Sequence, residues 1–319
     1  MNPGTDRAHP PLPARTVQVS VAASSANLGP GFDAVGLAVD LRDEVRVACA
    51  PAGDLAAPRT VVRVVGEGAE DVPLDERHLV ARWVRGGLAG LGAGADLVDL
   101  DLDCTNVVPH GRGLGSSAAA IVAGLASAWA LVHGEESQAD DLDRDQWLVA
   151  TSSAAEGHGD NAGASVLGGG VIAWSDGSTY RAAVLDVDPT LELVTCVPAE
   201  VLMTEVARSL LPATVPHSDA AFTGARTGLL VQALRGDRAL LLPGTEDRIH
   251  QQQRAGAMPR SHDLLTRLRA AGVAACVSGA GPALLCLGAD RDVVAAHAGD
   301  GWAVTARSTG SRVSASVLA

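Results

Sequence analysis

The sharpest local signal is Pro109-His-Gly-Arg-Gly-Leu-Gly-Ser-Ser-Ala-Ala119, where a glycine-rich loop runs directly into an Ala-rich helix. The glycines remove side chains, so that backbone N–H groups can close on phosphate oxygens, and the helix presents its positive dipole end to the same anion. Ser116 and Ser117 stand where they can cap the helix or offer a hydroxyl group to a phosphate or a metal. An ordinary capped turn is the alternative for this motif taken alone.

A second loop, Ala23-Ser-Ser-Ala-Asn-Leu-Gly-Pro-Gly-Phe-Asp-Ala-Val-Gly36, follows a predicted strand at Thr16 to Val21. Two glycines flank a proline and indicate a tight turn. The loop carries Asn27 and Asp33, an amide and a carboxylate that suit an ammonium or hydroxyl group of a small polar substrate. A structural loop would instead use both side chains to bond its own backbone.

A third glycine-rich turn, Val277-Ser-Gly-Ala-Gly-Pro282, lies between two apolar stretches that resemble strands. Such a turn lets a ligand or another backbone approach closely. The turn is a weak signal by itself. Three such loops in one lysine-free chain are harder to explain as ordinary turns.

The 319-residue chain has 24 basic residues, and all of them are arginines. The absence of lysine excludes a Walker A loop, a protein kinase site and Schiff-base or pyridoxal-phosphate chemistry, because each needs a lysine side chain. A phosphate must then be held by backbone amides, helix N-termini, arginines and a metal. The net charge of −13 disfavours nucleic acid and anionic membranes as partners.

Composition indicates a globular cytoplasmic protein, since 47% of the residues are hydrophobic. The longest apolar run, Ala118 to Val132, is shorter than the roughly 20 residues that span a bilayer. Residues 1–15 hold four prolines and no apolar segment, which predicts a disordered tail and no signal peptide. The five cysteines are scattered and indicate neither a disulfide framework nor a zinc site.

Periodicity predicts a mixed α/β protein with helices at Ser116 to His133 and Arg144 to Glu156. Helical and strand-like stretches alternate again toward the C-terminus, which indicates a second α+β layer. The glycine-rich break at Leu167 to Gly170 places the domain boundary near residues 172 and 173.

The three loops, in this order, resemble the three motifs of the GHMP kinases, and SSANLGPGFD at 24–33 is typical of their homoserine kinase subfamily. Three further stretches resemble that subfamily, so that the likeness covers nearly the whole chain: Glu156-Gly-His-Gly-Asp-Asn161, Thr204-Glu-Val-Ala-Arg-Ser-Leu-Leu-Pro212 and Asp247-Arg-Ile-His-Gln-Gln-Gln-Arg254. The resemblance implies a two-domain α+β GHMP kinase fold. An N-terminal ATP-binding domain at 16–172 would resemble the second domain of ribosomal protein S5, and a ferredoxin-like C-terminal domain would occupy 173–319.

The resemblance also implies small-molecule substrates, ATP and L-homoserine, with Mg²⁺ as cofactor and transfer of the γ-phosphoryl group to the homoserine hydroxyl. ATP would lie along the phosphate loop, at Pro109, Gly111, Arg112, Gly113, Leu114, Gly115, Ser116, Ser117 and Ala118. Ser117 and Glu156 are the candidate Mg²⁺ ligands, because Mg²⁺ takes a few protein oxygens besides phosphates and waters.

The acceptor would be held by residues of the other motifs. Arg208 and Arg254 match positions that clamp its carboxylate, since a guanidinium group binds a carboxylate bidentately. The amino and hydroxyl end would meet Asn27, Asp33, His158 and Gly281. The resemblance makes Asp160 a catalytic candidate as general base and Arg208 a second one, although positioning and Mg²⁺ could suffice while the hydroxyl proton passes to phosphate.

Five positions depart from the subfamily pattern, and none removes a charge that the mechanism needs: Ala22, His78, Gly159, Thr223 and Ala283. His78 replaces a common asparagine and leaves the adenine contacts open. One alternative function is a GHMP kinase for another acceptor, such as mevalonate or threonine. Another is a non-catalytic sensor on the same fold. The family often forms dimers, so a homodimer is an open expectation.

Overall fold

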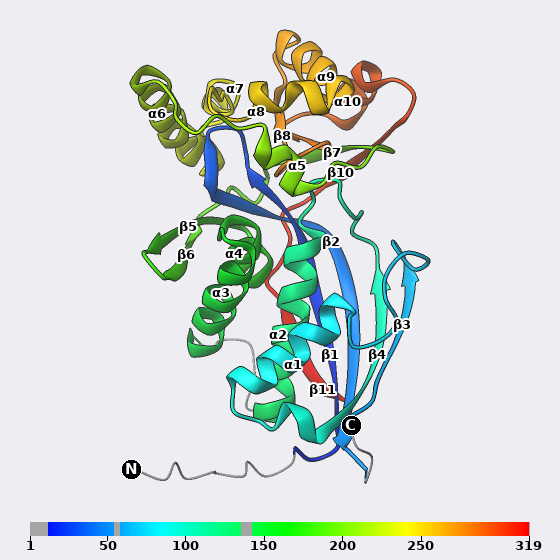
Figure 1. Cartoon of the computed structure of the whole chain (residues 1–319). Coiled ribbons are helices and arrows are strands. Elements are labelled where there is room, and N and C mark those ends of the chain that lie inside the picture. The colour runs from blue at the N-terminus through cyan, green and yellow to red at the C-terminus, as the bar shows by residue number, and fades with distance from the viewer. Residues whose placement is uncertain (1–11, 54–57, 135–141, 319) are drawn as a thin grey trace.

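The structure is a computed structural model that describes residues 12–53, 58–134 and 142–318. Helix α2 (Ser116–His133), which follows the phosphate loop, runs through the middle of the N-terminal half (Figure 1). Its sequence is rich in alanine, the strongest helix former, and the helix lies between two left-handed glycines, Gly115 and Gly134. Its length and hydropathy would also fit a membrane span, but 72% of it is buried inside the protein, as in a core helix.

The helices of the N-terminal half cover one face of a sheet that has seven strands among the described residues (Figure 1). The strand order is β11-β1-β2-β4-β3, and β5 pairs with β2 while β6 pairs with β5. All pairs are antiparallel except β3 with β4. The strands are β1 (Arg15–Asn27), β2 (Gly31–Pro51), β3 (Thr60–Gly66), β4 (Val98–Asn106), β5 (Gly170–Asp176), β6 (Thr179–Leu185) and β11 (Ser314–Leu318).

The remaining elements of this half are α1 (Leu79–Gly90), the 3₁₀ turn η1 (Ala95–Leu97), α3 (Leu142–Glu156) and α4 (Asp160–Leu167). Alternate residues of the strands, such as Val19 and Leu102, pack against Leu125 of α2 and Leu148 of α3 in one core. Each fully buried side chain of this kind contributes about 1.5–3 kcal/mol. The core therefore fixes the start of α2, and with it the phosphate loop.

The C-terminal half contains a four-stranded antiparallel sheet of β7 (Leu193–Pro198), β8 (Ala274–Val277), β9 (Leu284–Leu287) and β10 (Trp302–Arg307). Its order, β10-β7-β9-β8, is that of the expected ferredoxin-like arrangement, with helices in the crossover connections. Both faces are covered, so successive strand residues are buried on opposite sides. The helical elements are α5 (Thr204–Ser209), α6 (His217–Leu234), η3 (Arg238–Leu240), α7 (Leu241–Gly244), α8 (Gln251–Arg254), η4 (Ala255–Ala257), α9 (Pro259–Ala270) and α10 (Arg291–Ala298).

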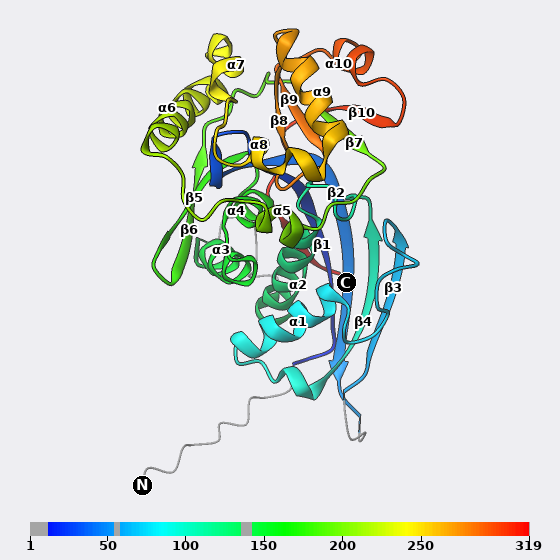
Figure 2. The same ribbon diagram turned by 45° about the horizontal axis from the view of Figure 1, so that its top comes forward.

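The β1–β2 hairpin joins the two halves. Its tip rises out of the first sheet toward α6 and α7 (Figures 1 and 2). Leu28, Val35 and Leu37 pack there with Leu193 and Leu230 in a core of the C-terminal half. The predicted second loop is thus two strand ends and a tight turn at residues 28–30.

The structure divides the chain differently from the boundary predicted at residues 172 and 173. That point falls inside β5, and the β5–β6 hairpin and the final strand β11 all belong to the first sheet. Of the predicted tail at 1–15, residues 1–11 lie outside the described part of the chain. Leu12 is buried in the N-terminal core, and Arg15 begins β1.

Candidate active site

The phosphate loop lies directly against the other two glycine-rich loops. Gly113 and Gly115 have φ of 81° and 69°, in the left-handed region that favours glycine. A Cβ on Gly113 would lie 2.3 Å from the carbonyl oxygen of Ser278, and one on Gly115 would lie 2.1 Å from Oγ of Ser24. The turn conformation and the close approach of both neighbouring loops therefore require these glycines.

Hydrogen bonds to both halves support the phosphate loop. The Asp43 carboxylate on β2 accepts hydrogen bonds from the backbone N–H groups of Val107 at 2.7 Å and Val108 at 2.9 Å. The Arg112 guanidinium donates to three carbonyl oxygens, among them that of Pro198 at 3.1 Å. Arg112 therefore ties the loop to the C-terminal half.

Glu156, the last residue of α3, lies beside the start of α2. Its Oε2 is buried and has no hydrogen-bond partner among the described residues. Burial raises the pKa of Glu156 to about 7; Asp160 adds to the rise, and His158, the Ser117 hydroxyl and Arg208 oppose it. An unpartnered carboxylate oxygen next to a hydroxyl group fits Mg²⁺, which binds oxygen ligands of this kind.

Asp160 begins α4 and is only 1% exposed. Its Oδ1 accepts hydrogen bonds from Nδ1 of His158 at 2.7 Å and from the backbone N–H of Asn161 at 2.8 Å. Burial lowers the pKa of His158, but the Asp160 carboxylate outweighs burial, so that the pKa is raised overall. The Asp160 carboxylate therefore favours the protonated form of His158, and a ligating oxygen of Asp33 lies within 4.8 Å of both side chains.

Asp33 and Arg208 form a bidentate pair across the two halves. Nη1 and Nη2 of Arg208 donate to the two carboxylate oxygens of Asp33 at 3.0 and 2.7 Å. The amide of Asn27 is used within the protein, because its Nδ2 donates to the Gly279 carbonyl at 2.8 Å and its Oδ1 accepts the Asp33 N–H at 2.9 Å. Asn27 thus connects the hairpin tip to the third loop.

Arg254, at the end of α8, is 1% exposed and almost wholly enclosed. Its Nε and Nη1 donate to the carbonyl oxygens of Ala207 and Gly279, each at 3.3 Å. The guanidinium groups of Arg208 and Arg254 both lie over the ring of Phe32, 5.8 and 5.6 Å from its centroid. Two cations therefore meet on one aromatic platform beside the Asp33 carboxylate.

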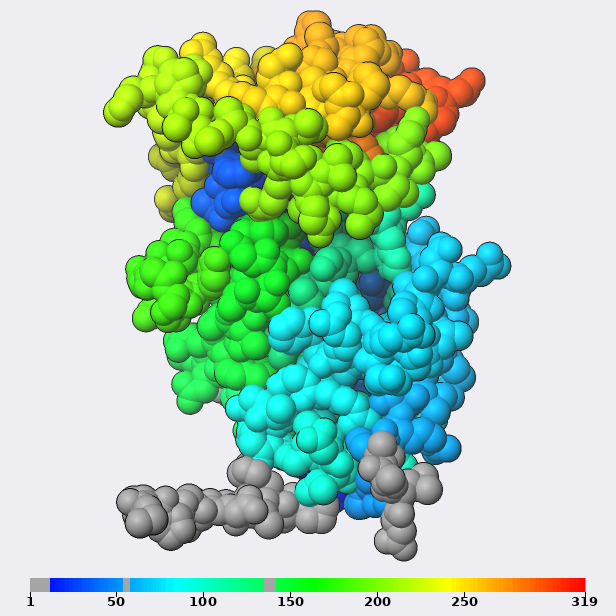
Figure 3. Space-filling view, in the orientation of Figure 1, coloured from blue at the N-terminus to red at the C-terminus, as the bar shows by residue number. Residues whose placement is uncertain are grey.

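A cavity of about 730 Å³ between the two halves brings these groups together. On the face seen in Figure 3, the surface is hollowed between the light green segment around α5 and the cyan and teal segments below it. A smaller cavity of about 300 Å³ adjoins it at Ser116 and Ser117 and is lined mainly by apolar residues such as Val80 and Ala119. His78 also lines this second cavity, and its buried Nδ1 has no partner within the described ranges.

The larger cavity gathers most of the residues that the sequence nominated. It is lined by Asn27, Asp33, Pro109, Gly111, Arg112, Gly113, Leu114, Gly115, Ser116, Ser117, Glu156, His158, Asp160, Arg208 and Arg254. Ala118 and Gly281 do not line it. Ala118 is buried in the core, and Gly281, within the third loop, lies against Gly113 and Met258.

Two residues of the site were missed as candidates. Asn161 lines the cavity, and its Oδ1 accepts a hydrogen bond from Oγ of Ser24 at 3.0 Å. Phe32 supplies the platform for the two arginines. Both residues lie in motifs quoted above, directly beside the candidates Asp160 and Asp33. Their position next to a charged candidate was the signal that could have identified them.

Comparisons with known proteins agree with this geometry. The family described as GHMP kinases N terminal domain matches residues 80–169. Homoserine kinase of Streptomyces avermitilis is 46% identical to this chain, and the match covers 98% of this chain and 98% of that protein. Homoserine kinase of Rhodococcus opacus is 49% identical, and the match covers 85% of this chain and 87% of that protein. A homoserine kinase from Cytophaga hutchinsonii has a similar solved structure, with a TM-score of 0.78 and 24% identity over 95% of this chain and 98% of that one.

Proposed function

The chain belongs to the homoserine kinase family of the GHMP kinases, and we propose that it transfers the γ-phosphoryl group of ATP to the side-chain hydroxyl of L-homoserine. It is an ATP-dependent kinase that acts on a hydroxyl group. One observation carries the choice of acceptor: a single cavity is lined by the phosphate loop, by Arg208 and Arg254, and by the Asp33 carboxylate. That combination complements the carboxylate and ammonium groups of an amino acid.

The nucleotide occupies both cavities in this proposal. The adenine ring takes the smaller, largely apolar cavity, where the neutral His78 offers the only imidazole nitrogen that is buried and unpartnered among the described residues. Burial lowers the pKa of His78, which keeps the ring neutral. The phosphates lie across the backbone of the phosphate loop and the positive end of α2.

Mg²⁺ would be held by Glu156 and Ser117, together with phosphate oxygens. The metal would supply positive charge to the transferring phosphoryl group. This chain has no lysine whose ammonium group could supply that charge. Glu156 supports this assignment through its buried, unpartnered Oε2.

The carboxylate of homoserine binds Arg254 and Arg208, and the ammonium group of homoserine binds Asp33. Arg208 acts in both places, because it already pairs with Asp33 and so aligns that carboxylate with the clamp. The two arginines, Arg208 and Arg254, form a clamp for the carboxylate. Asn27 and Phe32 keep this clamp and Asp33 in position and do not need to contact the substrate.

The acceptor hydroxyl lies toward Asp160 and Asn161, facing the phosphates. Oδ2 of Asp160 makes no hydrogen bond in the described ranges, so it is available to accept one from the hydroxyl. The other oxygen is held by His158, which fixes the orientation of the carboxylate. Catalysis then rests mainly on positioning and charge neutralisation.

Release of ADP by the purified protein tests the proposal. Mg-ATP is supplied with L-homoserine, mevalonate, L-threonine, L-serine or no acceptor. We expect strong release with homoserine alone. Release only with another acceptor would keep the kinase and replace the substrate, whereas no release with any acceptor would favour a sensor.

We also propose a cytoplasmic enzyme, in line with five free and buried cysteines. The expectation of a homodimer is tested by analytical ultracentrifugation.

A further inference from the structure

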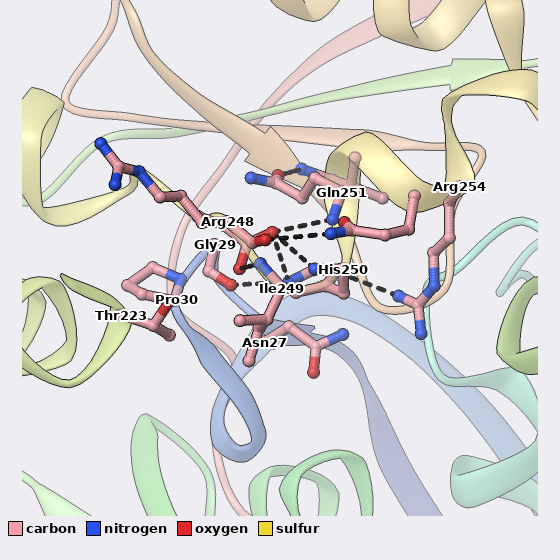
Figure 4. A network of polar contacts seen from close by, with 12 residues as sticks. Asn27, Gly29, Pro30, Thr223, Arg248, Ile249, His250, Gln251 and Arg254 are labelled. Carbon is pink, nitrogen blue, oxygen red and sulfur yellow. Dashed lines mark hydrogen bonds and ion pairs between the residues drawn. The ribbon is translucent and has the colours of Figure 1, made fainter. Parts of the chain in front are cut away.

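His250 lies behind the acceptor end of the cavity and is wholly buried. Its Nε2 is 2.6 Å from the carbonyl oxygen of Gly29 at the hairpin tip, and its Nδ1 is 3.1 Å from Nη1 of Arg254 (Figure 4). Its ring centroid lies 5.3 Å from that of Phe32. His250 therefore contacts the hairpin, the aromatic platform and one arginine of the clamp.

The partners of His250 determine its tautomer. A carbonyl oxygen can only accept, so Nε2 must carry the proton that is donated to Gly29. An arginine can only donate, so Nδ1 must be the bare acceptor for Arg254. A charged ring would turn an N–H group against the guanidinium. Burial lowers the pKa of His250, and the charge of Arg254 lowers it further against the opposing effect of Asp247 and Asp33, which agrees with a neutral ring.

Asp247 holds the backbone that carries His250. Its carboxylate accepts hydrogen bonds from the N–H groups of Ile249 at 2.9 Å, His250 at 3.0 Å and Gln251 at 2.8 Å. The Gln251 side chain in turn accepts the N–H of Val277 at 2.7 Å, at the start of the third loop. The segment is thus attached to the sheet beneath the site.

The two arginines of the clamp are held in different ways. Arg208 pairs with the Asp33 carboxylate, so its charge is largely balanced. Arg254 is held by three neutral acceptors, namely two carbonyl oxygens and the His250 imidazole. Neutral acceptors fix the direction of a guanidinium group without forming an ion pair, and the carboxylates of Asp33, Asp247 and Asp160 act on the Arg254 charge only from a longer distance. That charge is what an incoming carboxylate needs.

We propose that His250, fixed by Asp247, is a positioning residue that orients Arg254 toward the acceptor carboxylate while leaving its charge free. The inference rests on the proposed homoserine kinase function. It predicts that the two ring nitrogens of His250 have separable effects, because only Nδ1 contacts Arg254.

Two conservative variants separate the nitrogens. Gln in His250→Gln can place its amide N–H near the position of Nε2 and keep the bond to Gly29, but it offers no acceptor at Nδ1. Asn in His250→Asn can place its amide oxygen near Nδ1 and keep the bond to Arg254. His217→Gln, at an exposed position on α6, is the matched control.

We expect His250→Gln to raise KM for homoserine by about tenfold or more, since a buried charged donor loses its acceptor. KM for ATP and kcat should change by less than about threefold, because Arg254 binds homoserine and does not contact ATP. His250→Asn should raise KM for homoserine by clearly less than His250→Gln does. Equal KM values in His250→Gln and His217→Gln, or equal effects on both substrates, would overturn the proposal.

A failure of wild-type protein to use homoserine would instead refute the proposed function. The tautomer is measured on the wild-type protein, so that an unstable variant leaves the proposal testable. In ¹⁵N-histidine NMR, His250 is identified by its NOE to Phe32. We expect the Nε2-protonated neutral ring at pH 7. An Nδ1-protonated or charged ring would contradict the proposal.

Discussion

Replacing Glu156 with glutamine should make the ligand-free protein more stable while removing its activity. The side chain keeps its size, and it loses only the charge that burial disfavours. The rise of its pKa from 4.5 to about 7 corresponds to about 3 kcal/mol of unfavourable free energy for the ionised form. Because part of the side chain remains exposed, we expect a gain of about 2–3 kcal/mol in Glu156→Gln above pH 7.

The sign of this effect depends on pH. Between pH 4.5 and 7 the folded protein keeps the Glu156 proton that the unfolded chain has lost. The contribution of this group to stability is therefore present below pH 4.5 and falls as the pH rises to about 7. Glutamine does not titrate, so the variant and the wild type should be nearly equal at pH 4.5 and differ fully at pH 8.

Denaturant and thermal unfolding at both pH values measure the difference. For a chain of this length, about 2–3 kcal/mol corresponds to a rise in Tm of roughly 3–5 °C. Mg²⁺ with a non-hydrolysable ATP analogue should stabilise the wild type by about 3 kcal/mol at a hundredfold excess over Kd and should stabilise Glu156→Gln much less. Turnover should fall at least about a hundredfold.

Glu192→Gln, at an exposed position away from the site, is the control and should change neither property. If Glu156→Gln were no more stable than the wild type at pH 8 without Mg²⁺, the buried carboxylate would not be the charged group described above. If it kept wild-type turnover, Glu156 would not be a metal ligand.

Three further predictions concern other parts of the site. Gly113→Ala places a Cβ 2.3 Å from a carbonyl oxygen at φ 81°, so the free energy of unfolding in urea should fall by more than about 2 kcal/mol. In the control Gly224→Ala, the new Cβ has no neighbour within 4 Å, and the free energy of unfolding should rise by about 0.5–1 kcal/mol. Arg208→Lys keeps the charge but not the bidentate geometry, so KM for homoserine should rise at least about tenfold with KM for ATP unchanged; equal shifts in both would contradict the clamp. Because the pKa of His250 is lowered by burial, the wild type should lose up to about 1.4 kcal/mol per pH unit relative to His250→Asn as the pH falls below 6.5, and parallel stability curves would argue against a neutral ring.

Local features of the chain were predictable from sequence. Helix α2 has the predicted bounds, Ser116–His133, because a left-handed glycine precedes a long run of strong helix formers. Most of the candidate residues from the glycine-rich loops and the other motifs also line the larger cavity. These properties depend on residues that are close in sequence, or on motifs that contain the charged side chains of the site.

Long-range pairing could not be predicted in this way. The β5–β6 hairpin and β11 join the first sheet through partners far away in the chain, and nothing local distinguishes them from strands of the second sheet. Asn27 is a similar case. Its amide suits a substrate, but the fold brings the Gly279 carbonyl to within 2.8 Å of it, and this bond spans 252 positions.

The hairpin and the last strand have a consequence for synthesis on the ribosome. β1 is made early, yet its outer neighbour β11 (Ser314–Leu318) follows it more than 280 residues later. The hairpin tip needs Leu230 and Leu285, which are made more than 190 residues later than Leu28, to cover it. A nascent chain must therefore keep the tip and one edge of the first sheet exposed until these later segments have been made, which leaves apolar side chains open to aggregation during synthesis.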